Sequence, residues 1–194
     1  MNFLAGRQPS DAKVEMLEKI IIKVQQDYNT KIKEILEIQD VDYKIITQDL
    51  PRESGGYVKE RTNASAIPNK EATQIESVIF YTENIRQNIN LKFSKFTDKD
   101  IFEEIVETYI KYMFIHELVH VSQIKNGMTL EQYRATKYED SPYEKEANDK
   151  ATEFLKEDCS LFHSEIVDLI SGSNKRQMDN EYVTQLVILF QERS

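Results

Sequence analysis

The first forty residues carry apolar side chains at steps of three and four, which is the period of an amphipathic helix. These positions are Val14, Leu17, Ile21, Val24, Tyr28, Ile32 and Ile35. Ser10 stands just before them, and serine is a favoured residue at a helix N-cap. We therefore predict one long helix over about residues 11–38.

The period then changes to that of β-structure. Residues 43–47 and 57–62 predict two strands on either side of Ser54-Gly55-Gly56, which is a turn signal. Residues 74–81 end in four consecutive apolar or aromatic side chains and predict a better-buried strand. Residues 63–70 contain a proline and predict a loop. The sheet should therefore lie within about residues 42–81.

From Asp98 onward the pattern is helical. Apolar side chains recur from Ile101 to Val119 with a helical period, and Asn126-Gly127 is a normal stop signal. Around residues 112–115 the apolar side chains cover most of the helix circumference, so the middle of this helix should be buried.

Further helices are expected after this one. Ser141 is a candidate N-cap and Pro142 suits the first helical position, and residues 161–170 and 179–191 predict two more helices. The prediction is a single α+β domain over residues 1–194. It has a small sheet in the N-terminal half and a mainly helical body, over about residues 98–158 and 160–192.

Composition narrows the classes of function. The chain has 194 residues, of which 40% are hydrophobic and 30% charged, and its net charge is −9. That charge argues against nucleic acid as the main partner, and no apolar run is long enough to suggest a signal peptide or a membrane span. The single cysteine, Cys159, is expected to be a small buried residue. We expect a soluble cytoplasmic protein and leave its oligomeric state open.

Two of the three histidines stand four residues apart, as His116 and His120, in His116-Glu117-Leu118-Val119-His120. On a helix this spacing puts both imidazoles on one face, where they can reach one ion. Glu117 lies about 100° round the helix from His116 and can act on water at that ion. Burying these groups in an apolar helix would be costly without a cation. The motif therefore predicts a Zn²⁺ site with Glu117 as general base.

The motif resembles that of the zincin superfamily of metallopeptidases, in the branch whose third zinc ligand is a glutamate on a later helix. That branch often carries Asp or Asn four residues after the glutamate, and this chain has Glu144-Lys145-Glu146-Ala147-Asn148, beginning 24 residues after His120. The resemblance implies that Glu144 is the third ligand and that Asn148 orients a histidine. It also implies that an edge strand ahead of the active helix, here residues 74–81, holds an extended peptide. That segment could equally be an ordinary internal strand.

Other carboxylates compete with Glu144. Ser141 and Glu144 have the spacing of a capping box, in which the glutamate would serve only a backbone amide. Glu146 is the main alternative ligand, and Glu139 and Asp140 are more distant ones. The inward face of this helix is defined by Tyr143, Ala147, Ala151, Phe154 and Leu155, and Glu144 lies nearer its centre than Glu146.

Within the superfamily, the two motifs are similar to those of the ImmA/IrrE-type regulatory peptidases and related phage or bacterial zincin-like proteins. The similarity spans about residues 75–155. Val121-Ser122-Gln123 departs from the ImmA/IrrE pattern. Gln123 and Asn126 occupy positions where the metzincin variant would need Gly and His. The resemblance therefore implies the superfamily rather than one of its families.

The leading hypothesis is a zinc peptidase that cleaves a protein or peptide with water activated by Glu117. A zinc hydrolase of a non-peptide amide is one alternative, and a catalytically silent zincin-fold binding or regulatory module is another. The intact Glu117 favours catalysis, because a binding module needs no general base. His163, Tyr133, Tyr138 and Tyr143 are the candidates for stabilising a developing oxyanion.

Overall fold

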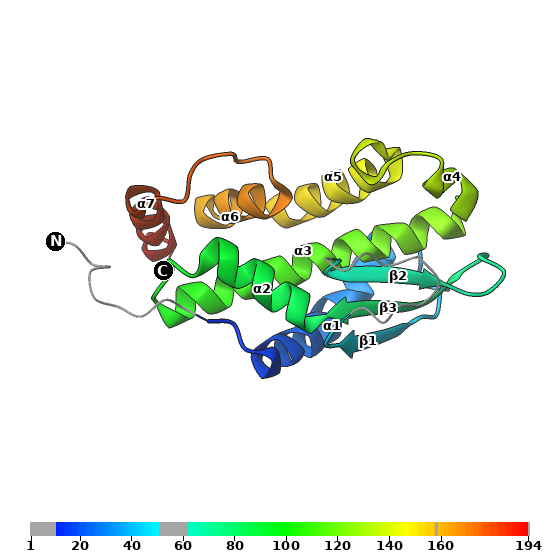
Figure 1. Ribbon diagram of the computed structural model, residues 1–194, viewed down its shortest axis with the longest axis horizontal. Helices are drawn as coiled ribbons and strands as arrows, with labels where there is room; N and C mark the ends of the chain where they lie inside the picture. The colour runs from blue at the N-terminus through cyan, green and yellow to red at the C-terminus, as the bar shows by residue number, and fades with distance from the viewer. Residues whose placement is uncertain (1–10, 51–61, 158, 194) are drawn as a thin grey trace.

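The computed structural model describes residues 11–50, 62–157 and 159–193. It is an α+β structure, as predicted, in which a three-stranded sheet lies beside a mainly helical body (Figure 1). Its elements are α1 Val14–Ile35, β1 Lys44–Gln48, β2 Ala64–Pro68, β3 Ile75–Tyr81, α2 Thr82–Phe93, α3 Lys99–Lys125, α4 Leu130–Arg134, the 3-10 turn η1 Tyr138–Asp140, α5 Pro142–Lys156, α6 Leu161–Ser171 and α7 Asn180–Gln191.

The strand order is β1–β3–β2, with β1 parallel and β2 antiparallel to β3. The predictions for β1 and β3 are confirmed to within one residue at each end. The expected loop over residues 63–70 is wrong, because it contains β2. A short strand with a proline at its end has a weak local signal, and its pairing with β3 stabilises it. The strand predicted over residues 57–62 lies almost wholly outside the described residues.

Two consequences follow for the edges of the sheet. β3 pairs on both sides, so of the two alternatives for residues 74–81 the internal strand is confirmed and the peptide-holding edge strand is wrong. In the described part of the chain the edges are β1 and β2. The backbone N–H of Tyr81 donates to the carbonyl of Asn63 over 2.8 Å. In an antiparallel pair alternate residues face the partner, so the backbone groups of Ala64 and Ala66 point away from β3.

The N-terminal helix α1 is shorter at both ends than the predicted 11–38. It ends at Ile35 because Glu37 adopts a left-handed conformation with φ 56°, after which the Ile38 N–H bonds back to the Lys33 carbonyl. Ile38 is nevertheless buried. The helix α2 had no counterpart among the predicted elements. It follows β3 directly and buries Ile85, Ile89 and Phe93.

The helix α3 is the centre of the molecule. It begins where predicted, with the Asp98 carboxylate accepting hydrogen bonds from the N–H groups of Asp100 and Ile101. In Figure 1 it runs between the sheet and α1 on one side and α5 and α6 on the other. Every residue from Tyr112 to Ile124 is buried. Any polar side chain in this stretch must therefore find its partners inside the protein.

The remaining predicted helices are confirmed as α5, α6 and α7. The helix α5 begins with Ser141 as N-cap and Pro142 in its first turn, as expected, and packs along α3 (Figure 1). The chain reaches it from α3 by way of the short helix α4 and the turn η1. None of the described helices combines the length and the apolar character needed to cross a lipid bilayer.

Candidate metal centre

The structure brings His116, His120 and Glu144 together. The Nε2 atoms of the two histidines lie 3.2 Å apart. Oε2 of Glu144 lies 3.3 Å from Nε2 of His116, and Oε1 lies 3.4 Å from Nε2 of His120. Within the described residues these three form a buried group whose ligand atoms could hold one metal ion.

The distances suit a small tetrahedral cation. With Zn–N and Zn–O bonds of about 2.0–2.1 Å, tetrahedral ligand atoms are separated by about 3.3 Å. The separation of the two Nε2 atoms is within 0.1 Å of this value, and so is the distance from each Nε2 to one oxygen of Glu144, Oε2 for His116 and Oε1 for His120. In addition, Oε2 of Glu144 is buried without a hydrogen-bond donor among the described residues. A buried carboxylate oxygen normally has a partner, and a cation between the three side chains would supply one. The residues present therefore fit a bound metal.

The electrostatics of the site also favour a cation. Burial lowers the pKa of His120, but Glu144 and Glu117 outweigh it and raise that pKa to about 9. Burial raises the pKa of Glu144, yet the neighbouring imidazoles of His116 and His120 bring it well below its usual range. The shift of His120 indicates that Glu144 and Glu117 create a negative potential at its imidazole. Positive charge is stabilised there, whether it is a proton or a metal ion.

Gln123 orients His120. Its Oε1 accepts from the Nδ1–H of His120 over 2.8 Å, so Nε2, which faces the site, is the nitrogen that a metal ion would bind in place of a proton. The side-chain amide of Gln123 donates to the Tyr143 carbonyl over 3.0 Å and to Oε2 of Glu146 over 2.9 Å. Sequence reasoning considered Gln123 only as a departure from a motif, although its i, i+3 spacing from His120 on one helix was a usable signal.

Asn148 does not have the role expected for it. Its Oδ1 accepts a hydrogen bond from the Tyr112 hydroxyl over 2.9 Å, and it contacts neither histidine through a hydrogen bond. Nδ1 of His116 is buried without a partner among the described residues. The prediction that Asn148 orients a histidine is therefore wrong, and Gln123 does so instead for His120.

Among the competing carboxylates, only Glu144 reaches the histidines. The Ser141–Glu144 capping box does not form, because Ser141 makes no side-chain cap hydrogen bond and Glu144 points into the site. Glu146 lies on the far side of Gln123 and pairs with Lys150 at 2.8 Å. Asp140 is exposed. The side chain of Glu139 lies outside the described part of the structure.

Glu117 is buried at the edge of the histidine pair. Burial raises the pKa of its carboxyl, and the nearby histidines and the backbone N–H of Ala66 on β2 oppose that effect. Glu117 also lines the same cleft as the two histidines and Glu144. Its carboxylate therefore has access both to the candidate metal position and to the outer edge of β2.

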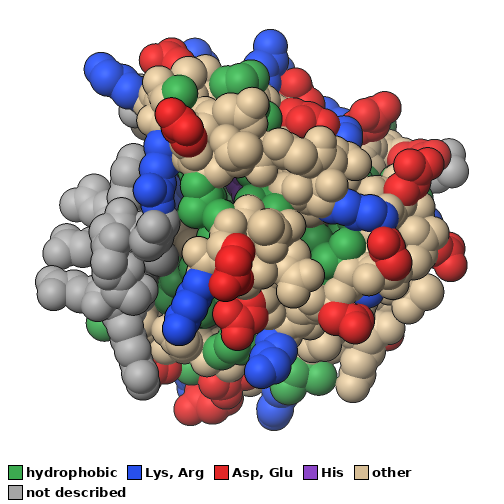
Figure 2. All heavy atoms as spheres, turned by 90° about the vertical axis from the view of Figure 1, so that its right-hand side faces the viewer, with side chains coloured by type: hydrophobic (Ala, Val, Ile, Leu, Met, Phe, Trp, Pro, Cys, Tyr) green, Lys and Arg blue, Asp and Glu red, His purple; other side chains and the backbone are tan. Residues whose placement is uncertain are grey.

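The site opens into a cleft with a volume of about 1190 Å³. β2 forms one wall, α3 the floor, and the segment from Met128 through α4 and η1 much of the other wall. In Figure 2 a histidine side chain is visible in purple at the bottom of the hollow between these walls. The cleft is large enough for several residues of a peptide.

The expected tyrosines occupy different places. The Tyr133 hydroxyl donates a hydrogen bond to Oε1 of Glu144, and its ring packs edge-on against His120. Tyr138 also lines the cleft, and burial together with the charge of Glu144 raises its pKa above its usual range. Tyr143 packs against the ring of Tyr133 and borders a smaller pocket on the other side of Gln123. The candidate site therefore contains Tyr133 and Tyr138.

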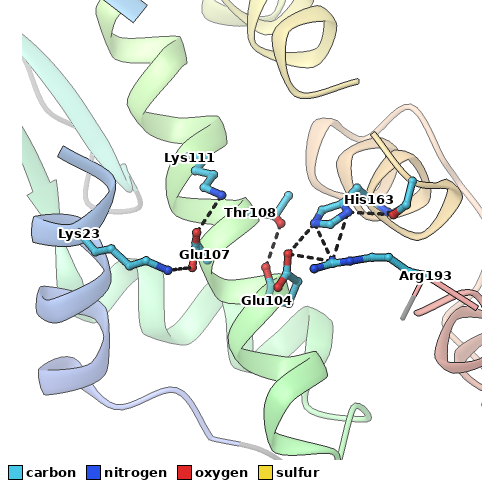
Figure 3. A network of polar contacts seen from close by, with 8 residues as sticks. Lys23, Glu104, Glu107, Thr108, Lys111, His163 and Arg193 are labelled. Atoms are coloured by element: carbon cyan, nitrogen blue, oxygen red, sulfur yellow. Dashed lines mark hydrogen bonds and ion pairs between the residues drawn. The ribbon is translucent and has the colours of Figure 1, made fainter. Parts of the chain in front are cut away.

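His163 is not part of this site. Its Nε2 lies 2.6 Å from Oε1 of Glu104, three turns along α3 from His116, and its Nδ1 lies 2.9 Å from the Ser160 hydroxyl. Figure 3 shows these contacts together with Arg193. The suggestion that His163 stabilises an oxyanion is wrong, because its ring is engaged between α3, α6 and the C-terminal segment. The prediction that Cys159 is buried is wrong, because its side chain is only partly buried.

No known protein family, curated protein or solved structure matches the chain in sequence or structural comparisons.

Proposed function

We propose that the protein is a zinc-dependent metallohydrolase, and specifically a peptidase with a zincin-like arrangement of its active-site helices. The observation that carries this proposal is the convergence of His116, His120 and Glu144, whose facing nitrogen and oxygen atoms lie 3.2–3.4 Å apart, beside Glu117 and at the bottom of a cleft. A salt bridge that served only the fold would need one histidine to face Glu144, whereas here the Nε2 atoms of both histidines converge on the carboxylate.

Zinc held by His116, His120 and Glu144 would act as a Lewis acid that acidifies water and polarises a carbonyl group. Glu117 takes the proton from the attacking water and passes it to the leaving amine. Its burial supports this role, since a raised pKa brings a carboxylate closer to the value at which it can both accept and release a proton. The Tyr133 hydroxyl donates to Oε1 of Glu144 and so holds that carboxylate in place, and Tyr138 lines the cleft beside it as a candidate donor to a developing oxyanion.

The outer edge of β2 supports a peptide as the substrate. The backbone groups of Ala64 and Ala66 point away from β3, and no described strand pairs with them. The Ala66 N–H is directed at Glu117, so the groups left for a peptide here are the Ala66 carbonyl and the backbone of Ala64. An extended peptide added along this edge would place its backbone beside the general base and above the histidines. A small non-peptide amide would not need such an edge.

The test uses protein purified without added metal, in the wild-type form and as Glu117→Gln. Elemental analysis should find close to one zinc per chain in both. Cleavage of a proteome-derived peptide mixture should fall in Glu117→Gln by a factor on the order of 10²–10⁴, which is the usual contribution of general acid–base catalysis.

Three outcomes would count against parts of this proposal. Loss of zinc in Glu117→Gln would make Glu117 a ligand. Absence of zinc from the wild type would remove the metal centre. If zinc were retained but the wild type cut no peptide, a binding or regulatory module would be the better interpretation. The His116→Ala/His120→Ala double variant is the metal-free control.

A further inference from the structure

The cleft has a charge opposite to that of the whole chain. The protein carries 34 acidic and 25 basic residues. Apart from Glu117 and Glu144, however, the charged side chains that line the cleft are Lys70, Lys92, Arg134, Lys137 and the single acidic residue Glu76. Figure 2 shows Lys and Arg side chains on both flanks of the hollow. A cleft that concentrates one sign of charge attracts ligands of the opposite sign.

Three of these cations have no internal counter-ion among the described residues. No ion pair among the described residues involves Lys70, Lys92 or Lys137. Lysines elsewhere form such pairs, for example Lys111 with Glu107 at 2.8 Å and Lys156 with Asp168 at 2.6 Å. Burial also lowers the pKa of Lys92, with no described carboxylate to offset it. The cleft lysines are therefore available to an external anion.

The cations lie at a distance from the candidate metal position, toward opposite ends of the cleft. Lys92 precedes Phe93 in α2, and the ring of Phe93 contacts the ring of Tyr109 on α3. The hydroxyl of Tyr109 in turn accepts a hydrogen bond over 3.1 Å from Asn63, which precedes β2. Tyr109 is seven residues from His116, or about 10 Å along the helix axis. In the other direction β2 continues for two residues beyond Ala66, or about 7 Å of extended chain, and Lys70 lies in the turn that follows Pro68. Cations therefore stand on both sides of the candidate metal.

We propose that this cleft takes extended acidic peptides, with Asp or Glu about three or four residues from the cleaved bond on each side. An extended peptide rises about 3.3 Å per residue, so these positions would meet Lys92 at one end and Lys70, with Arg134 and Lys137, at the other. This inference rests on the proposed peptidase function and adds the substrate class to it.

The first experiment measures binding without turnover. Zinc-loaded Glu117→Gln full-length protein is titrated against two fluorescein-labelled nine-residue peptides, one with Glu three residues to each side of a central alanine pair and one with Gln at those positions. We expect the Glu peptide to bind about tenfold more tightly, with the difference shrinking at high salt. Equal affinities would overturn the inference. Tighter binding of a single-stranded oligonucleotide in the same assay would also overturn it.

The second experiment separates the two ends of the cleft. The wild type, Lys92→Glu and Lys70→Glu are compared for the residues flanking the bonds they cut in a proteome-derived peptide mixture. Each charge reversal should abolish the enrichment of Asp and Glu on one side only. Lys99→Glu, at the start of α3 and outside the cleft, is the matched control and should keep both enrichments. Cleavage without any acidic enrichment would overturn the substrate class and leave the peptidase proposal intact. Peptide binding by the first assay without cleavage by the wild type would overturn the peptidase proposal alone.

Discussion

The side-chain oxygen of Gln123 accepts a hydrogen bond from Nδ1 of His120 over 2.8 Å, one turn along the same buried helix. This contact fixes which ring nitrogen of His120 carries the proton and turns the other toward Glu144. Because Gln123 is itself held by the Tyr143 carbonyl and Glu146, the orientation of His120 depends on both α3 and α5.

Removing this contact should weaken metal binding. Methionine has nearly the same volume as glutamine but lacks the side-chain carbonyl that accepts the hydrogen bond from Nδ1 of His120. In Gln123→Met we therefore expect zinc affinity to fall by about 10–100-fold. A competition titration with a chromophoric chelator measures the affinity, and a melting curve checks the fold. Gln26→Met, on an exposed position of α1, is the control. Unchanged affinity in a folded Gln123→Met protein would contradict this role.

The choice of third ligand can be tested by a pair of conservative changes. Glu144→Gln should reduce zinc affinity on the order of 100-fold or more, since it removes a charged ligand. Glu146→Gln should retain zinc, with a smaller loss through Gln123 at most. Zinc content after dialysis against a weak chelator distinguishes the two variants. A loss confined to Glu146→Gln would show that the arrangement of the carboxylates is different in solution.

Zinc should stabilise the fold, because its proposed ligands would join α3 to α5. A ligand that binds only the folded state at one hundred times its Kd adds about 2.7 kcal/mol. For a chain of this size that corresponds to a rise in Tm of roughly 5–10 °C. Calorimetry of metal-free and zinc-loaded protein measures the shift. Glu144→Gln should lose most of it, and an equal shift in that variant would point to zinc bound elsewhere.

Glu104 should make the protein sensitive to acid. Hydrogen bonds from His163 and Arg193 overcome its burial and hold its pKa at about 2 in the folded state, below its usual value near 4.5. A lowered carboxyl pKa stabilises the fold above the unfolded-state value, and this stabilisation is lost as the pH falls from about 4.5 toward 2. Glu104→Gln should therefore cost about 1–3 kcal/mol at pH 7 and much less near pH 2.

Urea unfolding of the wild type and Glu104→Gln at pH 7, 5, 4 and 3 tests this prediction. The neighbouring Glu103→Gln is the control, because Glu103 is half-exposed and its only described ion pair is with Lys99. A difference between wild type and Glu104→Gln that stayed constant with pH would mean that packing, and not charge, accounts for it.

The sequence was sufficient to predict elements whose signal is local. The period of α3, its Asp98 cap and the Ser141-Pro142 start of α5 were all visible in the chain, and so was the histidine pair. By contrast, α2 was missed although Ile85, Ile89 and Phe93 recur at steps of four. Its three asparagines, Asn84, Asn88 and Asn90, have low helix propensity and obscured that period.

What could not be predicted depends on contacts between distant segments. β2 is stabilised by pairing with β3, and its place at the edge follows from the strand order. Glu144 was favoured over Glu146 by the helical wheel, and the structure places Glu144 beside the histidines. The partner of His120 was missed because the resemblance drew attention to Asn148, whereas the fold pairs Asn148 with Tyr112.

Between His120 and Glu144 the chain leaves the core and returns to it. The helix α4 in this excursion has no buried residue, yet the excursion supplies Arg134, Lys137 and Tyr138 to the cleft wall. Substitutions at Arg134 and Lys137 should therefore cost little stability, in contrast to substitutions in α3. For the proposed peptidase, this segment is where selectivity can diverge while the metal centre is retained. Descendants of one ancestral gene should then vary most along this wall, without having to rebuild the interior.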